Sequence, residues 1–179
     1  MTGYFNRHND RVGLIALQGE QARIYCHPTH NFRVVSRGLG KLHFHGLTPL
    51  ADGLFKSLSM ARLERAKSPG SKSIVVLLSD CYPEPLTPGY EDKFDDPAYR
   101  NCISNARAYK REKVMLLLIN PTFSSAEARF PGERLSIKIA EAAGGKLIKL
   151  FRPKDTRYSP PSRKELNIIL QGIEESFVR

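Results

Sequence analysis

The segment SIVVLLSD, residues 73–80, contains five consecutive apolar residues and ends on a carboxylate. A strand that is apolar at consecutive positions is typical of a parallel sheet whose two faces are both covered. Pro69 and Gly70 stand just before this segment and separate it from the preceding one. We therefore predict a buried strand over 73–79, with Asp80 at its carboxyl end.

Four more segments have the character of strands. Residues 11–17, RVGLIAL, and residues 113–120, KVMLLLIN, are almost continuously apolar, and residues 146–151, KLIKLF, form a shorter run. Residues 22–26 follow the first of these after a short turn and are predicted to be its antiparallel hairpin partner. We expect Pro28 to end that partner strand, because proline has no N–H for the ladder.

Amphipathic segments alternate with these strands and predict helices. Within residues 50–66, Leu50, Leu54, Leu58 and Ala61 recur at helical spacing, which places them on one face of a helix. Ser162 and Glu165 form a capping box at the start of a last helix, about residues 161–177. Further helices are expected at 31–39 with Asn31 as cap, from Pro97 onward with Asp96 as cap, and at 132–143.

The order of elements predicts an α/β fold. Strands that alternate with amphipathic helices form a doubly wound, mostly parallel sheet with helices on both faces, and the initial hairpin adds one antiparallel edge strand. The length of 179 residues is typical of one domain. Because no internal repeat, low-complexity tract or linker divides the sequence, we expect a single domain over residues 1–179.

Composition argues against several classes of protein. No apolar run approaches the roughly 20 residues that span a bilayer, and residues 1–7 contain no apolar core of a secretion signal. The cysteines Cys26, Cys81 and Cys102 are an odd number without metal-ligand spacing, so we interpret them as reduced thiols. These features predict a cytoplasmic protein without a membrane partner.

The net charge of +10 raises the question of an acidic partner. Lysine and arginine are spread along the whole chain. The densest group, KREK at 110–113, stands where a helix is expected to end and where the helix dipole favours cations. This pattern is typical of a solvated basic surface and does not favour nucleic acid. A basic nucleic-acid-binding domain stays an alternative, which a salt-dependent shift assay tests.

Oxygen-bearing side chains stand where a site is expected. Open α/β sheets bind ligands at the carboxyl ends of their strands. Asp80 ends the strand at 73–79, and Thr48 lies in the loop GLTPLADGL, residues 46–54, which leads into a helix. A hydroxyl and a carboxylate suit Mg²⁺, which prefers about six oxygen ligands. Each residue also has a structural explanation, because Thr48 can cap the helix and Asp80 can stabilise the turn.

Three segments in this order resemble the von Willebrand factor A domain: RVGLIALQG at 11–19, GLTPLADGL at 46–54 and IVVLLSD at 74–80. The phrase TPLA and the strand before it look most like the C-terminal domain of magnesium-chelatase D subunits and their cobaltochelatase relatives. The resemblance covers about residues 4–152. It implies the doubly wound fold predicted above.

The resemblance also implies a metal-ion-dependent adhesion site. In that family a D-x-S-x-S loop, a threonine and an aspartate hold a divalent cation, and a partner protein supplies a carboxylate to it. Thr48 matches the threonine and Asp80 the aspartate. The implied function is a non-catalytic protein-interaction module of a magnesium-chelatase-type assembly, which inserts metal into a tetrapyrrole. The alternative is a von Willebrand factor A protein that serves another ATPase or metallocofactor complex.

The sequence departs from the family because no D-x-S-x-S loop occurs in it, and the family's first strand is missing. Cys81 also stands where the family usually has glycine. Without the central strand, the strands at 11–17 and 73–79 each present an unpaired apolar edge. We expect a truncated or split domain whose edges recruit a companion segment or a second copy. A rearrangement in which those two strands pair directly is a further alternative, and Mg²⁺ binding to Thr48 and Asp80 alone should be weak.

Other chemistry has little support in the sequence. His43 and His45 alternate on an extended segment, and His27 and His30 lie upstream, but no motif supplies the three or four ligands of a zinc site. Cys81 as a nucleophile would need a neighbouring histidine and an orienting group. Because the chain has no G-x-x-x-x-G-K-[ST] loop, we expect no ATP hydrolysis and no catalytic residues in it.

Overall fold

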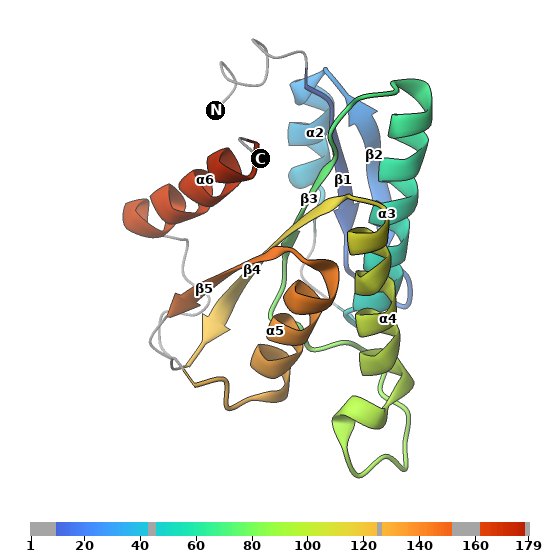
Figure 1. Ribbon diagram of the computed structural model, residues 1–179, viewed down its shortest axis with the longest axis vertical. Helices are drawn as coiled ribbons and strands as arrows, with labels where there is room; N and C mark the ends of the chain where they lie inside the picture. The colour runs from blue at the N-terminus through green and yellow to red at the C-terminus, as the bar shows by residue number, and fades with distance from the viewer. Residues whose placement is uncertain (1–9, 43–45, 125–126, 152–161, 178–179) are drawn as a thin grey trace.

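The computed structural model describes residues 10–42, 46–124, 127–151 and 162–177, and strands and helices alternate along most of its length (Figure 1). The elements in chain order are β1 (Val12–Ala16), β2 (Arg23–Thr29), α2 (Phe32–Leu39), α3 (Leu50–Lys67), β3 (Ile74–Leu78), the 3₁₀ turn η1 (Lys93–Asp95), α4 (Pro97–Arg111), β4 (Met115–Phe123), α5 (Pro131–Ala143), β5 (Lys146–Phe151) and α6 (Arg163–Phe177).

The strands form two sheets rather than one. β3, β4 and β5 are parallel in that spatial order, with Ile74 opposite Met115 and Leu118 opposite Leu147. β1 and β2 form an antiparallel pair. The predicted α/β architecture and its antiparallel edge strand are therefore confirmed. The sheet is interrupted between β1 and β3, which do not pair with each other, so direct pairing of these two strands is not what the structure adopts.

Helices cover both faces of the parallel sheet, as the consecutive apolar residues of β4 require (Figure 1). Leu116 and Leu118 point into the main core with α3, α4 and α5, and both are fully buried. Leu117 and Ile119 face the opposite side, where Ile169 of α6 packs against them. Among the described residues, no helix combines the length and apolarity needed to cross a bilayer.

Two strands are longer than predicted, and both contain a proline. β2 continues through Pro28 to Thr29, which lies opposite Val12 across an irregular register. β4 continues through Pro121 to Phe123, where its register with β5 shifts after Asn120. The expectation that Pro28 ends its strand is wrong, because edge strands and bulges leave the missing N–H of proline without a required partner.

The predicted helix caps are confirmed. Asn31 Oδ1 accepts the amide of Arg33 at 3.1 Å at the start of α2. Ser162 donates its amide to the Glu165 carboxylate at 2.7 Å, and its hydroxyl accepts the Glu165 amide at 3.3 Å. These local patterns needed no tertiary partner, so the sequence was sufficient to locate them.

Asp96 is buried and holds two backbone segments together. Its Oδ1 accepts the amide of Ala98 in the first turn of α4, and its Oδ2 accepts the amide of Thr87 in the preceding loop, each at 2.7 Å. Both donors would lose their partner without this carboxylate. Asp92 makes a similar local bond to the amide of Phe94, at 2.9 Å, but is exposed.

Asp96→Ala is expected to reduce the free energy of unfolding by about 2 kcal/mol, because it leaves the amides of Ala98 and Thr87 without their acceptor. Urea unfolding followed by circular dichroism measures the loss. The matched variant Asp92→Ala should lose about half of that or less, since water can satisfy the exposed donor. Equal losses in the two variants would contradict the importance of burial at Asp96.

Candidate functional site

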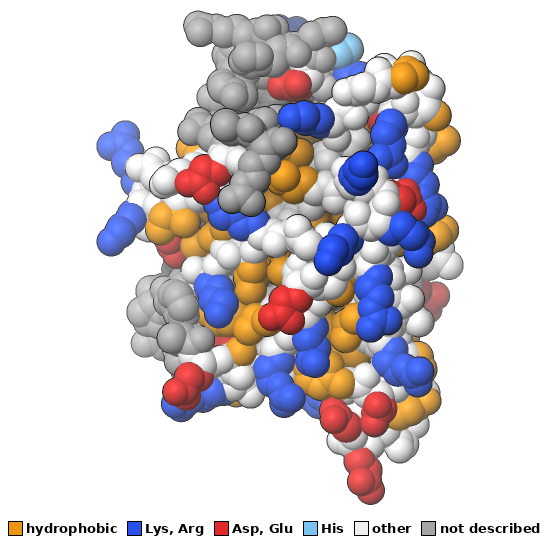
Figure 2. Space-filling model, in the orientation of Figure 1, with side chains coloured by type: hydrophobic (Ala, Val, Ile, Leu, Met, Phe, Trp, Pro, Cys, Tyr) orange, Lys and Arg blue, Asp and Glu red, His pale blue; other side chains and the backbone are white. Residues whose placement is uncertain are grey.

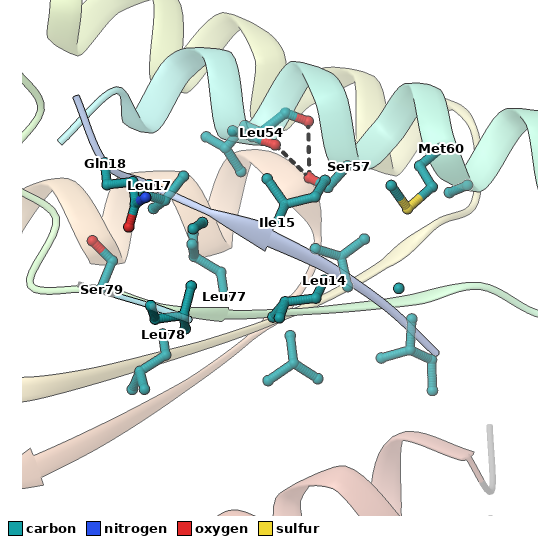
Figure 3. Close-up of a pocket in the computed structure, with 18 of the residues that line it drawn as sticks. Leu14, Ile15, Leu17, Gln18, Leu54, Ser57, Met60, Leu77, Leu78 and Ser79 are labelled. Carbon is teal, nitrogen blue, oxygen red and sulfur yellow. Dashed lines mark hydrogen bonds between the residues drawn. The ribbon is translucent and has the colours of Figure 1, made fainter. Parts of the chain in front are cut away.

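A cavity of about 740 Å³ lies between β1 and β3, at the break in the sheet. Leu14, Ile15 and Leu17 line it from β1 and the turn after it, and Leu77 and Leu78 line it from β3 (Figure 3). Leu54, Ser57 and Met60 of α3 close one side. The walls are therefore mostly apolar, and the backbone of two strands forms the opposite edges.

Thr48 and Asp80 both line this cavity, together with Gln18 and Ser79. Gln18 follows β1, and Ser79 and Asp80 follow β3, so this is the end of the cavity at which both strands finish. Thr48 lies at this end as well, because its carbonyl accepts the amide of Glu84 in the loop after Asp80, so the structure brings the two sequence-predicted site residues to the same end of one cavity. That position agrees with the rule that α/β sheets bind ligands at the carboxyl ends of strands.

A third oxygen-bearing side chain, Glu84, lies beside this pair. The Thr48 amide donates to Glu84 Oε2 at 3.3 Å, and the Glu84 amide donates to the Thr48 carbonyl at 2.9 Å. The loop that leads into α3 is therefore tied to the loop that follows β3. Sequence reasoning missed Glu84, although a carboxylate four residues after Asp80 in the same loop was the available signal.

Asp80 is half-buried, and hydrogen bonds do not fully offset the cost of burying its negative charge. Burial raises the pKa of Asp80 above its usual range, and the nearby Glu84 carboxylate adds to the increase. The amide of Tyr82, which donates to Asp80 Oδ1 at a long 3.4 Å, acts in the opposite direction. The protein therefore stabilises the negative charge of Asp80 only in part, and a cation beside this carboxylate would stabilise it further.

The two structural explanations, that Thr48 caps a helix and that Asp80 stabilises a turn, have unequal support. No side chain caps α3, because Pro49 occupies the N-cap position, so the hydroxyl of Thr48 does not serve as a cap. Asp80 does stabilise its turn, through the long bond from Tyr82. The hydroxyl of Thr48 and the carboxylates of Asp80 and Glu84 are hard oxygen donors of the kind that suits Mg²⁺. An octahedral Mg²⁺ shell would need further oxygen ligands besides these three.

Other candidate groups do not form a centre. Among the described residues, no group of three His, Cys, Asp or Glu side chains is placed to hold a metal ion. His43 and His45 lie outside the described residues. His30 is exposed and its Nδ1 lies 3.1 Å from the carbonyl of Asp10. The described part of the chain therefore gives the zinc alternative no support.

Cys81 is fully buried, and burial raises the pKa of its thiol far above the ordinary value. A buried thiol that stays protonated is a poor nucleophile, so the structure argues against catalysis by Cys81. Its backbone adopts φ 59°, in the left-handed region that favours glycine.

Basic side chains are scattered over the face of the molecule seen in Figure 2, with acidic and hydrophobic groups among them. They form no continuous stripe on this face. A nucleic-acid-binding surface would require lysine and arginine to gather along one groove or helix. The view therefore agrees with the interpretation of a solvated basic surface.

Comparison of the sequence with known proteins gives one partial match. No protein-family model matches the chain. One curated relative, the uncharacterized protein Rv2850c of Mycobacterium tuberculosis, is 27% identical over 84 residues, which is 45% of this chain and only 13% of that protein. The match thus spans a small part of the relative's length.

Two solved structures share the architecture. The SpRpn10 VWA domain superposes with a TM-score of 0.54 at 15% identity, covering 95% of this chain and 77% of that one. The conserved hypothetical protein BatB from Bacteroides thetaiotaomicron gives a TM-score of 0.58 at 13% identity, covering 99% and 87%. With the observed strand order and helix layers, these likenesses show that the chain has a von Willebrand factor A-like fold.

Proposed function

We propose that this protein is a non-catalytic protein-interaction module. It binds an acidic group of a partner protein at the carboxyl end of β3, where Thr48 and Asp80 hold a divalent cation between the two proteins. The observation that carries this proposal is the position of Thr48 and Asp80 at the same end of one cavity. The burial of Cys81 also supports a binding role rather than a catalytic one.

The partner we favour is an ATPase subunit of a magnesium-chelatase-type assembly. This finer assignment rests on the resemblance of residues 46–54 and 74–80 to chelatase D subunits. A purified chelatase ATPase subunit should bind the 179-residue chain, with the complex detected by light scattering. Asp80→Asn should weaken it at least tenfold in Mg²⁺. If no complex forms with the ATPase subunit, the chelatase assignment is wrong and service to another ATPase complex becomes the better hypothesis.

The cation itself is expected to bind weakly to the isolated chain. Thr48, Asp80 and Glu84 supply only part of an octahedral shell, so the dissociation constant for Mg²⁺ should be millimolar or weaker. Mn²⁺, which broadens nearby NMR signals even at low occupancy, is the practical probe. We expect it to broaden the amide signals of Thr48 and Asp80 first, and Mg²⁺ to reverse the effect.

The cation affinity should fall as pH decreases. Burial raises the pKa of Asp80, so protons compete with the metal at a higher pH than for an ordinary carboxylate. Mn²⁺ broadening should therefore be weaker at pH 5 than at pH 7.5. Asp80→Asn should abolish it, whereas Asp95→Asn, at an exposed carboxylate of the same loop, should leave it unchanged. Micromolar binding, or full broadening in Asp80→Asn, would contradict the proposed site.

A further inference from the structure

The edges of β1 and β3 that face the cavity have no strand partner. Among the described residues, β1 pairs with β2 alone and β3 pairs with β4 alone. An unpaired edge of a strand is a template for another strand, because its N–H and C=O groups need hydrogen-bond partners. Here two such edges stand on opposite sides of one apolar cavity.

The two edges run in the same direction. Arg11, just before β1, forms an ion pair of 2.9 Å with Glu64 near the end of α3, while Leu17, just after β1, packs against Gly53 near the start of α3. β1 is therefore antiparallel to α3. β3 follows the end of α3 in the chain, and the loop after β3 returns to the start of α3, where the Glu84 amide donates to the Thr48 carbonyl at 2.9 Å. A strand between β1 and β3 can accordingly be parallel to both.

The backbone of β3 presents regularly spaced groups to the cavity. The carbonyl of Ser73 accepts the amide of Met115 at 3.2 Å, and the amide of Ser79 donates to the carbonyl of Ile119 at 3.1 Å. Odd-numbered residues of this strand therefore bond to β4. Because backbone groups alternate between the two sides of a parallel strand, those of Ile74, Val76 and Leu78 point toward the cavity.

Two apolar side chains of β3 beside the gap also remain uncovered. Val76 is 46% exposed and Leu78 is 64% exposed, although a strand of this composition is normally buried on both faces. The cavity follows the whole of residues 73–80, a length of roughly 23 Å at the rise of a parallel strand. An extended apolar segment matches this shape and chemistry, whereas a compact ligand would leave most of both edges unpaired.

We propose that the gap between β1 and β3 is a slot for a β-strand, which an extended apolar segment of a partner protein fills. The inserted segment runs parallel to β1 and β3, forms hydrogen bonds to both, and joins the two sheets into one with the order β2, β1, inserted strand, β3, β4, β5. This inference deepens the proposed function by naming a binding mode, but it does not require the cation.

The occupant must have two free edges, which argues for a partner segment rather than a second copy. Every described strand of this chain already pairs on at least one edge, so a copy would have to unpair a strand to fill the slot. The remaining segments of this sequence, 1–9, 43–45, 125–126, 152–161 and 178–179, contain no run of five apolar residues like that in β3. None of these residues supplies a matching strand, and we assign the strand to a partner protein.

Binding of a model strand to the 179-residue chain in the presence of EDTA tests the slot. The probe is a fluorescent synthetic peptide of three Val-Ile repeats flanked by glutamates, which complement the net charge of +10. Its matched control carries the same side chains but N-methyl groups at alternate residues, which remove the donors of one edge. We expect the control to bind at least tenfold more weakly in fluorescence anisotropy, and the unmodified peptide to slow amide hydrogen exchange at Ile74, Val76 and Leu78.

Variants at Val76 give a second test. Val76→Pro removes a cavity-facing N–H without removing a bond to β4, so it should fold and lose at least tenfold in peptide affinity. Val76→Ala keeps the amide and should lose less peptide affinity than Val76→Pro. The proposal would be overturned if the unmodified peptide did not bind, or if the N-methylated peptide bound with equal affinity. It would also be overturned if the chain formed a stable dimer in which the amides of Ile74, Val76 and Leu78 exchange slowly before peptide is added. Because EDTA is present throughout, these outcomes are independent of the cation site, whose failure the Mn²⁺ titration detects separately.

Discussion

Glu133→Ala is expected to reduce the free energy of unfolding by about 4 kcal/mol, the largest single loss that we predict for this protein. The Glu133 carboxylate is 1% exposed and accepts three backbone amides: Ser124 at 2.6 Å, Arg129 at 2.8 Å and Phe130 at 3.2 Å. Removing it leaves these donors without their acceptor, at about 1–3 kcal/mol for each one that water cannot reach. Urea unfolding of the two proteins measures the difference.

The control for this variant lies on the same helix. Glu141→Ala removes an exposed carboxylate near the end of α5 and should change the free energy of unfolding by less than about 0.5 kcal/mol. Similar losses for both variants would show that the effect comes from helix composition and not from the buried carboxylate. A loss below about 1 kcal/mol in Glu133→Ala would mean that water or side chains replace the acceptor.

The contribution of Glu133 should also depend on pH. Burial by itself would raise its pKa, but the amide donors, led by Ser124, hold the pKa of Glu133 below its ordinary value of 4.5. A lowered pKa means that the fold favours the ionised form. The stabilisation is therefore complete above about pH 4.5 and is lost as pH falls through the lower pKa of the folded state. The difference in the free energy of unfolding between wild type and Glu133→Ala should therefore become smaller as the pH falls through that range.

Gly132→Ala is expected to cost about 3 kcal/mol and to displace the turn that carries Asp80. A Cβ at this position would collide with the carbonyl oxygen of Asp80 and lie 2.5 Å from the ring of Tyr82. The start of α5 would then have to move away from the end of β3, at a cost typical of overpacked cores. Because the turn carries a proposed ligand, Mn²⁺ broadening at Asp80 should weaken at temperatures where the variant is still folded.

Gly40→Ala is the matched control for this substitution. Gly40 has φ −67°, and an added Cβ would meet its nearest neighbours at an ordinary 3.7 Å. Its stability should stay within about 1 kcal/mol of wild type, in either direction. Thermal unfolding of both glycine variants distinguishes the effect of close packing from a general effect of replacing glycine. An equal change in the two would contradict the close contact at Gly132.

Local sequence patterns were sufficient to locate most helices and strands. The caps at Asn31, Asp96 and Ser162 act within a few residues, so the structure reproduces them where the sequence predicts them. The ends of β2 and β4 were misplaced, because the tolerance for Pro28 and Pro121 depends on strand neighbours that are distant in sequence. The consecutive apolar residues of β3 predicted two covered faces, but part of this strand stays exposed at the gap.

The candidate site was only partly predictable. Asp80 follows a recognisable buried strand and Thr48 belongs to a recognisable loop, so both could be chosen from the sequence. Glu84 was visible as a carboxylate four residues after Asp80, but its contact with Thr48 depends on the path of the loop after β3. The raised pKa of Asp80 likewise results from burial by other segments, which a sequence does not measure.

The sequence by itself determined the order of elements, the apolar character of the strands and the absence of a D-x-S-x-S loop, because these are properties of neighbouring residues. Only the tertiary structure decided how β1 and β3 lie relative to each other. It keeps β1 and β3 apart across an open cavity and does not pair them. The physical reason is that α3 packs against β1 and against the core beneath β3, which fixes the two strands on either side of the cavity.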